Sequence, residues 1–145
     1  MINFFWKKFS SLTVHELYEI LSLRAEVFVV EQKCIYQDAD GKDEIAIHLI
    51  GIENNKLVAY LRLFPPTKNN PIIFGRVIVA KSARQKSYGK KLIEEMLNFC
   101  DKHFPQTKIK CSAQLYLKKF YEEFGFKIVG DSYLEDDIPH IEMQK

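Results

Sequence analysis

The chain has 145 residues, which is enough for one domain over residues 1–145 that buries roughly 68–70% of the surface of its unfolded form. Hydrophobic residues make up 47% and charged residues 28%, a mixture that excludes a disordered or fibrous protein. A net charge of +2 argues against a nucleic-acid partner, and no apolar run approaches the ~20 residues of a membrane-spanning helix.

The N-terminal third is predicted to hold one strand and one helix. Ile2–Lys7 has the composition of a strand, and Val14–Val30 carries apolar residues at a helical period. Thr13, with Glu16 three residues later, predicts a capping box at the start of this helix. The polar stretch Glu31–Glu44 is predicted as a loop.

The middle of the chain predicts three strands. Ile45–Ile52 and Leu57–Phe64 are strand-like, and the four polar residues 53–56 between them suit a hairpin turn. Ile72–Val79 is a nearly continuous apolar run, which is typical of a buried central strand.

The C-terminal part alternates between helices and strands. The pattern predicts a long helix over about Gln85–His103, a strand over Lys108–Ala113 and a short helix over Leu115–Phe124, followed by strands over Phe126–Val129 and Ile138–Met143. Strands outnumber helices and alternate with them in the second half. We therefore expect an α/β (α+β) fold in which one mixed sheet is flanked by helices on both faces.

The most informative segment is the polar turn between the buried strand and the long helix. A turn that leads into a helix leaves backbone N–H groups without partners, and together with the helix dipole they form an anion site suited to phosphate. Arg84, Lys86 and Lys90 add positive charge there. A solvated basic helix start remains the alternative. The turn lacks the glycine pattern of a phosphate-loop NTPase and that of a dinucleotide-binding protein.

This turn resembles the signature of the GNAT acetyltransferases, in which a strand precedes Gln or Arg, two residues, Gly, one residue, and Gly or Ala. Arg84–Gly89 fits with one departure, because Ser87 stands where the first glycine is usual. A left-handed conformation at Ser87 would cost on the order of 1–2 kcal/mol. The resemblance implies the GNAT fold, acetyl-CoA as co-substrate and no metal. It implies that the coenzyme contacts Val77, Ile78, Val79, Arg84, Gln85, Lys86, Ser87, Tyr88, Gly89, Lys90 and Gln114, the first three through their backbone.

A second segment also resembles the family. Many GNAT members have Asn, Tyr seven residues later and Gly-Phe after four more, and here Gln114, Tyr121, Gly125 and Phe126 occupy those spacings, with Gln in place of Asn. The resemblance implies that Tyr121 is the general acid that protonates the departing thiolate. The alternative is that Tyr121 only packs beside its aromatic neighbours.

Further blocks resemble the ElaA-type branch of this family and cover nearly the whole chain in the same order. They are Phe28–Gln32, Tyr36–Gly41, Gly75–Val79, Phe120–Phe126 and Ile138–His140. The resemblance implies an N-acetyltransferase that moves an acetyl group directly from acetyl-CoA to a primary amine in a ternary complex. The acceptor, a small molecule or a protein amine, is not identified, and either a monomer or a homodimer is compatible with the sequence.

The general base is left open. Some members carry a Glu on the central strand, whereas Ile72–Val79 contains no carboxylate. The candidates are His48, Glu31 and His140, with Glu44 or a bound water chain as further options. Acidic residues near the expected acceptor side are a possible attraction for a cationic amine; they are Glu31, Asp38, Asp40, Asp43, Glu44, Glu135, Asp136 and Asp137.

Two rival functions remain. One is a non-catalytic acyl-CoA-binding or regulatory module on the same fold, which the missing strand carboxylate favours. The other is a cysteine-dependent acyltransferase in which Cys111 forms a covalent intermediate, which needs a base beside the thiol. The cysteines number three, an odd count without metal-type spacing, so a reducing cytoplasm is expected.

Overall fold

One seven-stranded mixed sheet runs through the molecule in the order β1-β2-β3-β4-β5-β7-β6. All neighbouring strands are antiparallel except β4 and β5, which are parallel. The computed structural model describes residues 1–145. The strands are β1 (Asn3–Lys8), β2 (Ile47–Glu53), β3 (Lys56–Phe64), β4 (Ile72–Val79), β5 (Ile109–Gln114), β6 (Lys127–Glu135) and β7 (Ile138–Gln144).

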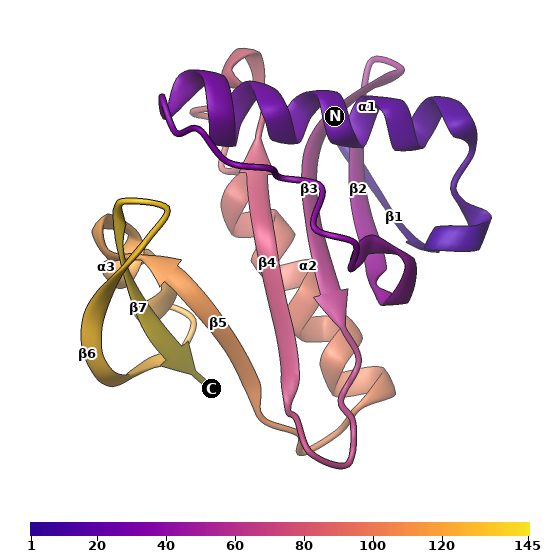
Figure 1. Cartoon of the computed structure of the whole chain (residues 1–145). Coiled ribbons are helices and arrows are strands. Elements are labelled where there is room, and N and C mark those ends of the chain that lie inside the picture. The colour runs from indigo at the N-terminus through magenta and orange to yellow at the C-terminus, as the bar shows by residue number, and fades with distance from the viewer.

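Helices cover both faces of this sheet. Helix α1 (Val14–Arg24) continues as a π-helical segment, Ala25–Glu31, and crosses one face, whereas α2 (Tyr88–His103) lies against the other (Figure 1). The short α3 (Lys118–Glu122) lies beside the β5–β7 end of the sheet. The predicted α/β (α+β) class, with a mixed sheet flanked on both faces, is confirmed.

Local signals located most of these elements correctly. The capping box forms as predicted, because Thr13 accepts from the backbone of Glu16 while the Glu16 side chain accepts from the backbone of Thr13. The long helix begins at Tyr88 rather than at the predicted Gln85, because Gln85 has a positive φ of 67° that a right-handed helix excludes. Strand β6 runs to Glu135, six residues beyond the predicted end, because its polar second half pairs with β7.

The core lies between α2 and the central strands. Leu92, Ile93 and Met96 of α2 are fully buried against residues of β3 and β4. Trp6 of β1 stacks on Phe99 of α2 with ring centroids 4.1 Å apart, which anchors the edge strand to the same helix. The helix–sheet packing therefore holds β4 and the start of α2 in a defined relation. None of the helices is both long and apolar enough to cross a membrane.

Candidate active site

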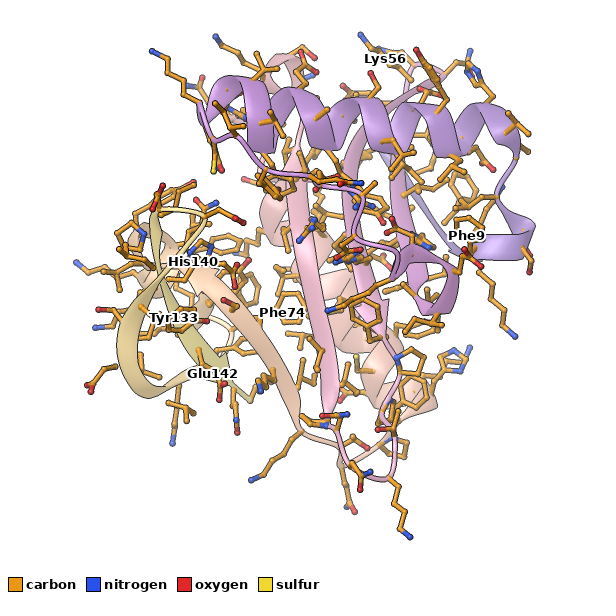
Figure 2. All side chains as sticks on the ribbon, in the orientation of Figure 1. Phe9, Lys56, Phe74, Tyr133, His140 and Glu142 are labelled. Atoms are coloured by element: carbon orange, nitrogen blue, oxygen red, sulfur yellow. The ribbon has the colours of Figure 1, made fainter.

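The parallel strands β4 and β5 pair only at their beginnings and then separate. Ile72 pairs with Ile109 and Ile73 with Lys110, and no further residues of the two strands are in register. The edge of β4 that faces β5 therefore has no strand partner from Phe74 onward. A cavity of about 720 Å³ lies here, lined by both strands, by the π-helical segment and by the β6–β7 hairpin. Figure 2 shows Phe74 between β4 and β5, and His140 near the end of β5, where it pairs with Gln114.

A β-bulge lies on β4 where it borders this cleft. Arg62 pairs with Gly75 and Tyr60 with Ile78, so Arg76 and Val77 together oppose the single residue Leu61. Arg76 has a φ of +54°, a left-handed conformation that costs a residue with a Cβ roughly 1–2 kcal/mol. The bulge changes the direction of the unpaired backbone of β4 inside the cleft.

The turn before α2 has the backbone of an anion site. Gln85 and Ser87 have positive φ values of 67° and 59°, and alternation of this kind directs successive N–H groups toward one concavity. No side chain caps α2, and its first turn contains no acidic residue. A Cβ on Gly89 would lie 3.8 Å from Phe120 and 3.9 Å from Val79, so the helix start packs between β4 and the α3 region.

Ser87 occupies the position where the family signature has glycine, and the left-handed conformation considered from the sequence is present there. We expect Ser87→Gly to raise the unfolding free energy by about 0.5–1 kcal/mol, since glycine removes the left-handed penalty but loses more entropy on folding. The matched control is Ser82→Gly in the neighbouring 3₁₀ turn, where φ is not positive, so glycine should not raise the unfolding free energy. Urea unfolding measures both variants. A decrease in the unfolding free energy of Ser87→Gly as large as that of Ser82→Gly would contradict this explanation.

Two of the basic side chains of the turn form ion pairs within the protein. Arg84 forms a two-pronged pair with Glu31 at 2.8 and 3.1 Å and donates to the carbonyl of Val79. Lys86 pairs with Glu53 at 3.0 Å, and the same carboxylate accepts from the hydroxyl of Tyr88. Lys90 forms no ion pair. The groups of the turn that remain without a partner are therefore chiefly main-chain groups, and Arg84 joins the turn to the π-helical segment.

Tyr121 lies where the cleft meets the core. Its ring packs against Phe74, Phe120 and Phe126, with centroids 5.1–6.0 Å away. Tyr121 is one of the residues that line the cleft, and its hydroxyl forms no hydrogen bond within the protein but is not fully enclosed. Burial, with smaller contributions from Cys111 and Tyr116, raises the pKa of Tyr121 well above its usual value. The phenol is therefore protonated at neutral pH and available as a proton donor.

Gln114 and Cys111, two residues with roles considered from the sequence, both line the cleft but differ in their contacts. Gln114 lines the cleft and exchanges amide hydrogen bonds with Gln32 at 3.2 and 3.4 Å, which links β5 to the segment after the π-helix. Cys111 also lines the cleft, but burial and then Glu142 raise the pKa of its thiol to about 12, and no base hydrogen bonds to it. A covalent role for Cys111 therefore lacks the activation that it requires.

The three candidate bases lie in different surroundings. His48 is fully buried outside the cleft lining, and both its ring nitrogens are used: Nδ1 accepts from Tyr60 at 2.6 Å and Nε2 donates to the carbonyl of Asp43 at 2.9 Å. Burial lowers its pKa. The structure thus removes His48 as a candidate, because an apolar strand holds it inside the protein. Glu31 lines the cleft but is bound by Arg84.

His140 is the candidate that faces the cleft. It lies on β7 opposite Gln114 of β5 and Tyr133 of β6, on whose ring it stacks. Its Nδ1 is 2.6 Å from the carbonyl of Ile138, which can only accept, so Nδ1 carries the proton and Nε2 has the free lone pair. Nε2 is 3.5 Å from a carboxylate oxygen of Glu135. The unprotonated ring nitrogen and the carboxylate therefore lie next to each other in the lining of the cleft.

A group of buried charges beside the cleft was missed by the sequence analysis. Arg24 and Arg62 are almost completely buried and pair with Asp38, Asp40 and Asp43. These aspartates are therefore neutralised, and the expectation that they attract a cationic acceptor is wrong for them. The sequence contains one indication of this group. Arg24 lies four residues after Ile20, on the apolar side of its helix, and a buried positive charge requires buried acidic partners.

Comparisons with known proteins identify the family and the fold of this chain. A family model described as Acetyltransferase (GNAT) domain matches residues 14–145. Protein ElaA of Escherichia coli K12 is 42% identical over 139 residues, which are 94% of this chain and 91% of ElaA. The crystal structure of Escherichia coli ElaA superposes with a TM-score of 0.93 at 40% identity, covering 100% of this chain and 99% of that one.

Two other solved structures extend the likeness. An acyl-CoA N-acyltransferase from Pseudomonas aeruginosa superposes with a TM-score of 0.95 at 40% identity, over 100% of this chain and 99% of that chain. An aminoglycoside 6'-N-acetyltransferase complexed with coenzyme A shares the fold, with a TM-score of 0.73 at 18% identity over 97% of this chain and 96% of that chain.

Proposed function

The chain belongs to the GNAT acetyltransferase family, and on that premise we propose that it transfers an acetyl group from acetyl-CoA directly to a primary amine. The observation that carries the proposal is the cleft between β4 and β5, which has an unpaired strand edge on one wall and Tyr121 in its lining. An uncapped helix start lies at the far end of β4. These three features match the arm, the thioester and the diphosphate of a coenzyme.

The proposed coenzyme site combines main-chain groups along one path. The diphosphate takes the turn Gln85–Gly89 and the first residues of α2, with Lys90 as an added charge. The pantetheine arm lies along Val77–Val79 as an added strand, because this edge of β4 has no partner in the protein. Gln114 contacts the arm from the opposite wall. A fold neighbour complexed with coenzyme A supports this choice of ligand.

The proposed reaction needs no covalent intermediate on the protein. The amine nitrogen attacks the thioester carbonyl, the carbon–sulfur bond breaks, and the Tyr121 hydroxyl gives its proton to the departing sulfur. A backbone N–H at the β4 bulge polarises the carbonyl oxygen during the attack. The products are the N-acetylated amine and coenzyme A as a free thiol. The phenol carries its proton at neutral pH, as a donor must, but burial raises its pKa and makes it a weaker acid, so the proton moves as the carbon–sulfur bond breaks and the sulfur becomes basic.

We assign the base to His140. His140 lines the cleft with its Nε2 not committed to a backbone partner, and Glu135 is placed to stabilise the imidazolium that forms when the amine loses its proton. Glu135 and Asp136 on this wall have no lysine or arginine partner, so they supply the attraction for a cationic acceptor that the paired aspartates cannot. A cytoplasmic location is part of the proposal, supported by three unpaired thiols.

Binding of acetyl-CoA tests the first half of the proposal. At a concentration a hundredfold above its dissociation constant, acetyl-CoA should stabilise the fold by about 2.7 kcal/mol, because it binds only the folded state. A thermal melt with increasing ligand measures this shift, with acetate and pantetheine at equal concentration as controls. An unchanged melting temperature at millimolar acetyl-CoA would overturn the assignment.

Turnover separates the enzyme from a non-catalytic acyl-CoA-binding module, which the lack of a carboxylate on β4 favours. The measurement is thiol release from acetyl-CoA over a panel of amines: polyamines, amino sugars, amino acids and peptides. Release that depends on one amine class identifies the acceptor. Tight binding without release from any of them would favour the module.

A further inference from the structure

Six charged side chains beside the cleft form a closed ring of alternating sign. Around the ring, Arg24 pairs with Asp38, Asp38 with Arg76, Arg76 with Asp40, Asp40 with Arg62, Arg62 with Asp43, and Asp43 with Arg24. The nitrogen–oxygen distances run from 2.5 to 3.4 Å. The ring joins α1, β3 and β4 to the loop between the π-helical segment and β2. We call it the Arg–Asp ring.

Arg76 holds a special position in the Arg–Asp ring, because it is the member that lies on the β4 bulge. Its Nε donates to Asp38 Oδ1 at 2.7 Å, and its Nη2 donates to the Asp38 carbonyl at 3.0 Å and to Asp40 Oδ2 at 3.4 Å. The guanidinium also lies over the rings of Phe28 and Tyr36, 6.0 Å from each centroid. These contacts fix the side chain of a residue whose backbone is in the strained left-handed conformation.

The loop does not depend on Arg76 for its own attachment. Asp38 is held independently by Arg24, through its carboxylate at 2.7 Å and its carbonyl at 3.1 Å. Asp40 is held independently by two bonds from Arg62. The guanidinium of Arg76 therefore adds little to anchoring the loop. Because the loop is already fixed, the contact instead restrains Arg76 itself and therefore the backbone of the β4 bulge.

We propose that Arg76 is a positioning residue for the transfer reaction: the Arg–Asp ring acts through its side chain to hold the β4 bulge so that a backbone N–H there points at the thioester carbonyl. This inference rests on the proposed function. Arg76 and Val77 lie outside the regular β3–β4 ladder, so without this tether their peptide planes would rotate and the donor would turn away from the carbonyl. Arg76 touches neither the coenzyme nor the acceptor in this account.

The carbonyl stretch of bound acetyl-CoA tests the proposal without knowledge of the acceptor. Isotope-edited infrared spectra of acetyl-CoA labelled with ¹³C at the thioester carbonyl report the strength of the hydrogen bond to that oxygen. In the wild type the stretch should lie below that of the free ligand. In Arg76→Gln the stretching frequency should return toward that of free acetyl-CoA by at least about half of the wild-type shift. The dissociation constant of acetyl-CoA should change less than about twofold.

Two variants complete the experiment. Arg76→Lys keeps the positive charge but loses the forked guanidinium that contacts two aspartates, so we expect a carbonyl frequency between those of the wild type and Arg76→Gln. If Arg76→Gln does not fold, Arg76→Lys is the variant that tests the proposal. Lys42→Gln removes a positive charge from the same cleft outside the Arg–Asp ring and should leave the stretch unchanged. With an acceptor from the amine panel, kcat in Arg76→Gln should fall about 10²-fold at unchanged KM for acetyl-CoA.

The outcomes are distinguishable. A wild-type stretch in folded Arg76→Gln or Arg76→Lys overturns the positioning role and leaves the proposed function intact. A loss of stability with normal carbonyl stretch and kcat also overturns it, because that is the result of a purely structural contact. Failure of the wild type to bind acetyl-CoA overturns both.

Discussion

Replacing Arg24 with alanine is expected to lower the free energy of unfolding by about 3–5 kcal/mol. Arg24 is fully buried, and its removal leaves the three aspartates of the Arg–Asp ring with only two arginines, hence one uncompensated negative charge in the interior. Hydrogen bonds and charges from Arg24 and Arg62 outweigh the burial that would raise the pKa of Asp43, and its pKa lies below the usual value. Equilibrium urea unfolding of Arg24→Ala measures the effect.

The matched control is Lys7→Ala. Lys7 and Glu16 form an ion pair at 2.7 Å, as short as those of Arg24, but both side chains are partly exposed. We expect this change to lower the unfolding free energy by less than about 1 kcal/mol, because water replaces the lost partner. Similar losses in the two variants would show that burial does not make the Arg–Asp ring a major contributor to stability.

Tyr121→Phe is expected to lower kcat by about 10²- to 10⁴-fold with little change in the dissociation constant of acetyl-CoA. Phenylalanine keeps the ring that packs against Phe74 and Phe126 but lacks the proton that the leaving thiolate needs. Since burial raises the pKa of Tyr121, the phenol stays protonated, and the ratio of wild-type to variant rates should be constant from about pH 6 to about pH 9. Thiol release with the acceptor from the amine panel measures both rates.

Tyr116→Phe is the control for this experiment. Tyr116 also lines the cleft, but it is 75% exposed and belongs to the short turn after β5. Its hydroxyl has no proposed role, so near-normal turnover is expected. Full activity in Tyr121→Phe would assign the tyrosine to packing alone and leave protonation of the sulfur to solvent or another group.

The Arg–Asp ring explains why the acidic loop beside the cleft is buried rather than solvated. The sequence Asp38-Ala39-Asp40-Gly41 has the composition of a solvated turn, and Asp38 is nevertheless only 8% exposed. Its carboxylate receives bonds from two arginines that are 14 and 38 residues distant in the chain. The carboxylates in the cleft lining that have no lysine or arginine partner are on the β6–β7 wall, at Glu135 and Asp136.

The sequence by itself determined what depends on neighbouring residues. Apolar period located the strands and helices, Thr13 and Glu16 set the start of α1, and Gly125 adopts the left-handed conformation, with a φ of 91°, that closes the helical region before it. The turn Arg84–Gly89 and Tyr121 stood out because their residues and spacings resemble two GNAT motifs, and both motifs are short and local in the chain. Family membership followed from such blocks.

Only the tertiary structure decided which of these residues meet. His48 and His140 both lie on predicted strands, yet one is enclosed by Tyr60 and Asp43 and the other faces the cleft. Arg84 is bound to Glu31, 53 residues away in the chain. The bulge at Arg76 and the Arg–Asp ring depend on strand register and on contacts between distant segments. Local periodicity determines which side chains of a strand face the core but not which residues pair, because a shift of the register by two residues keeps the same alternation.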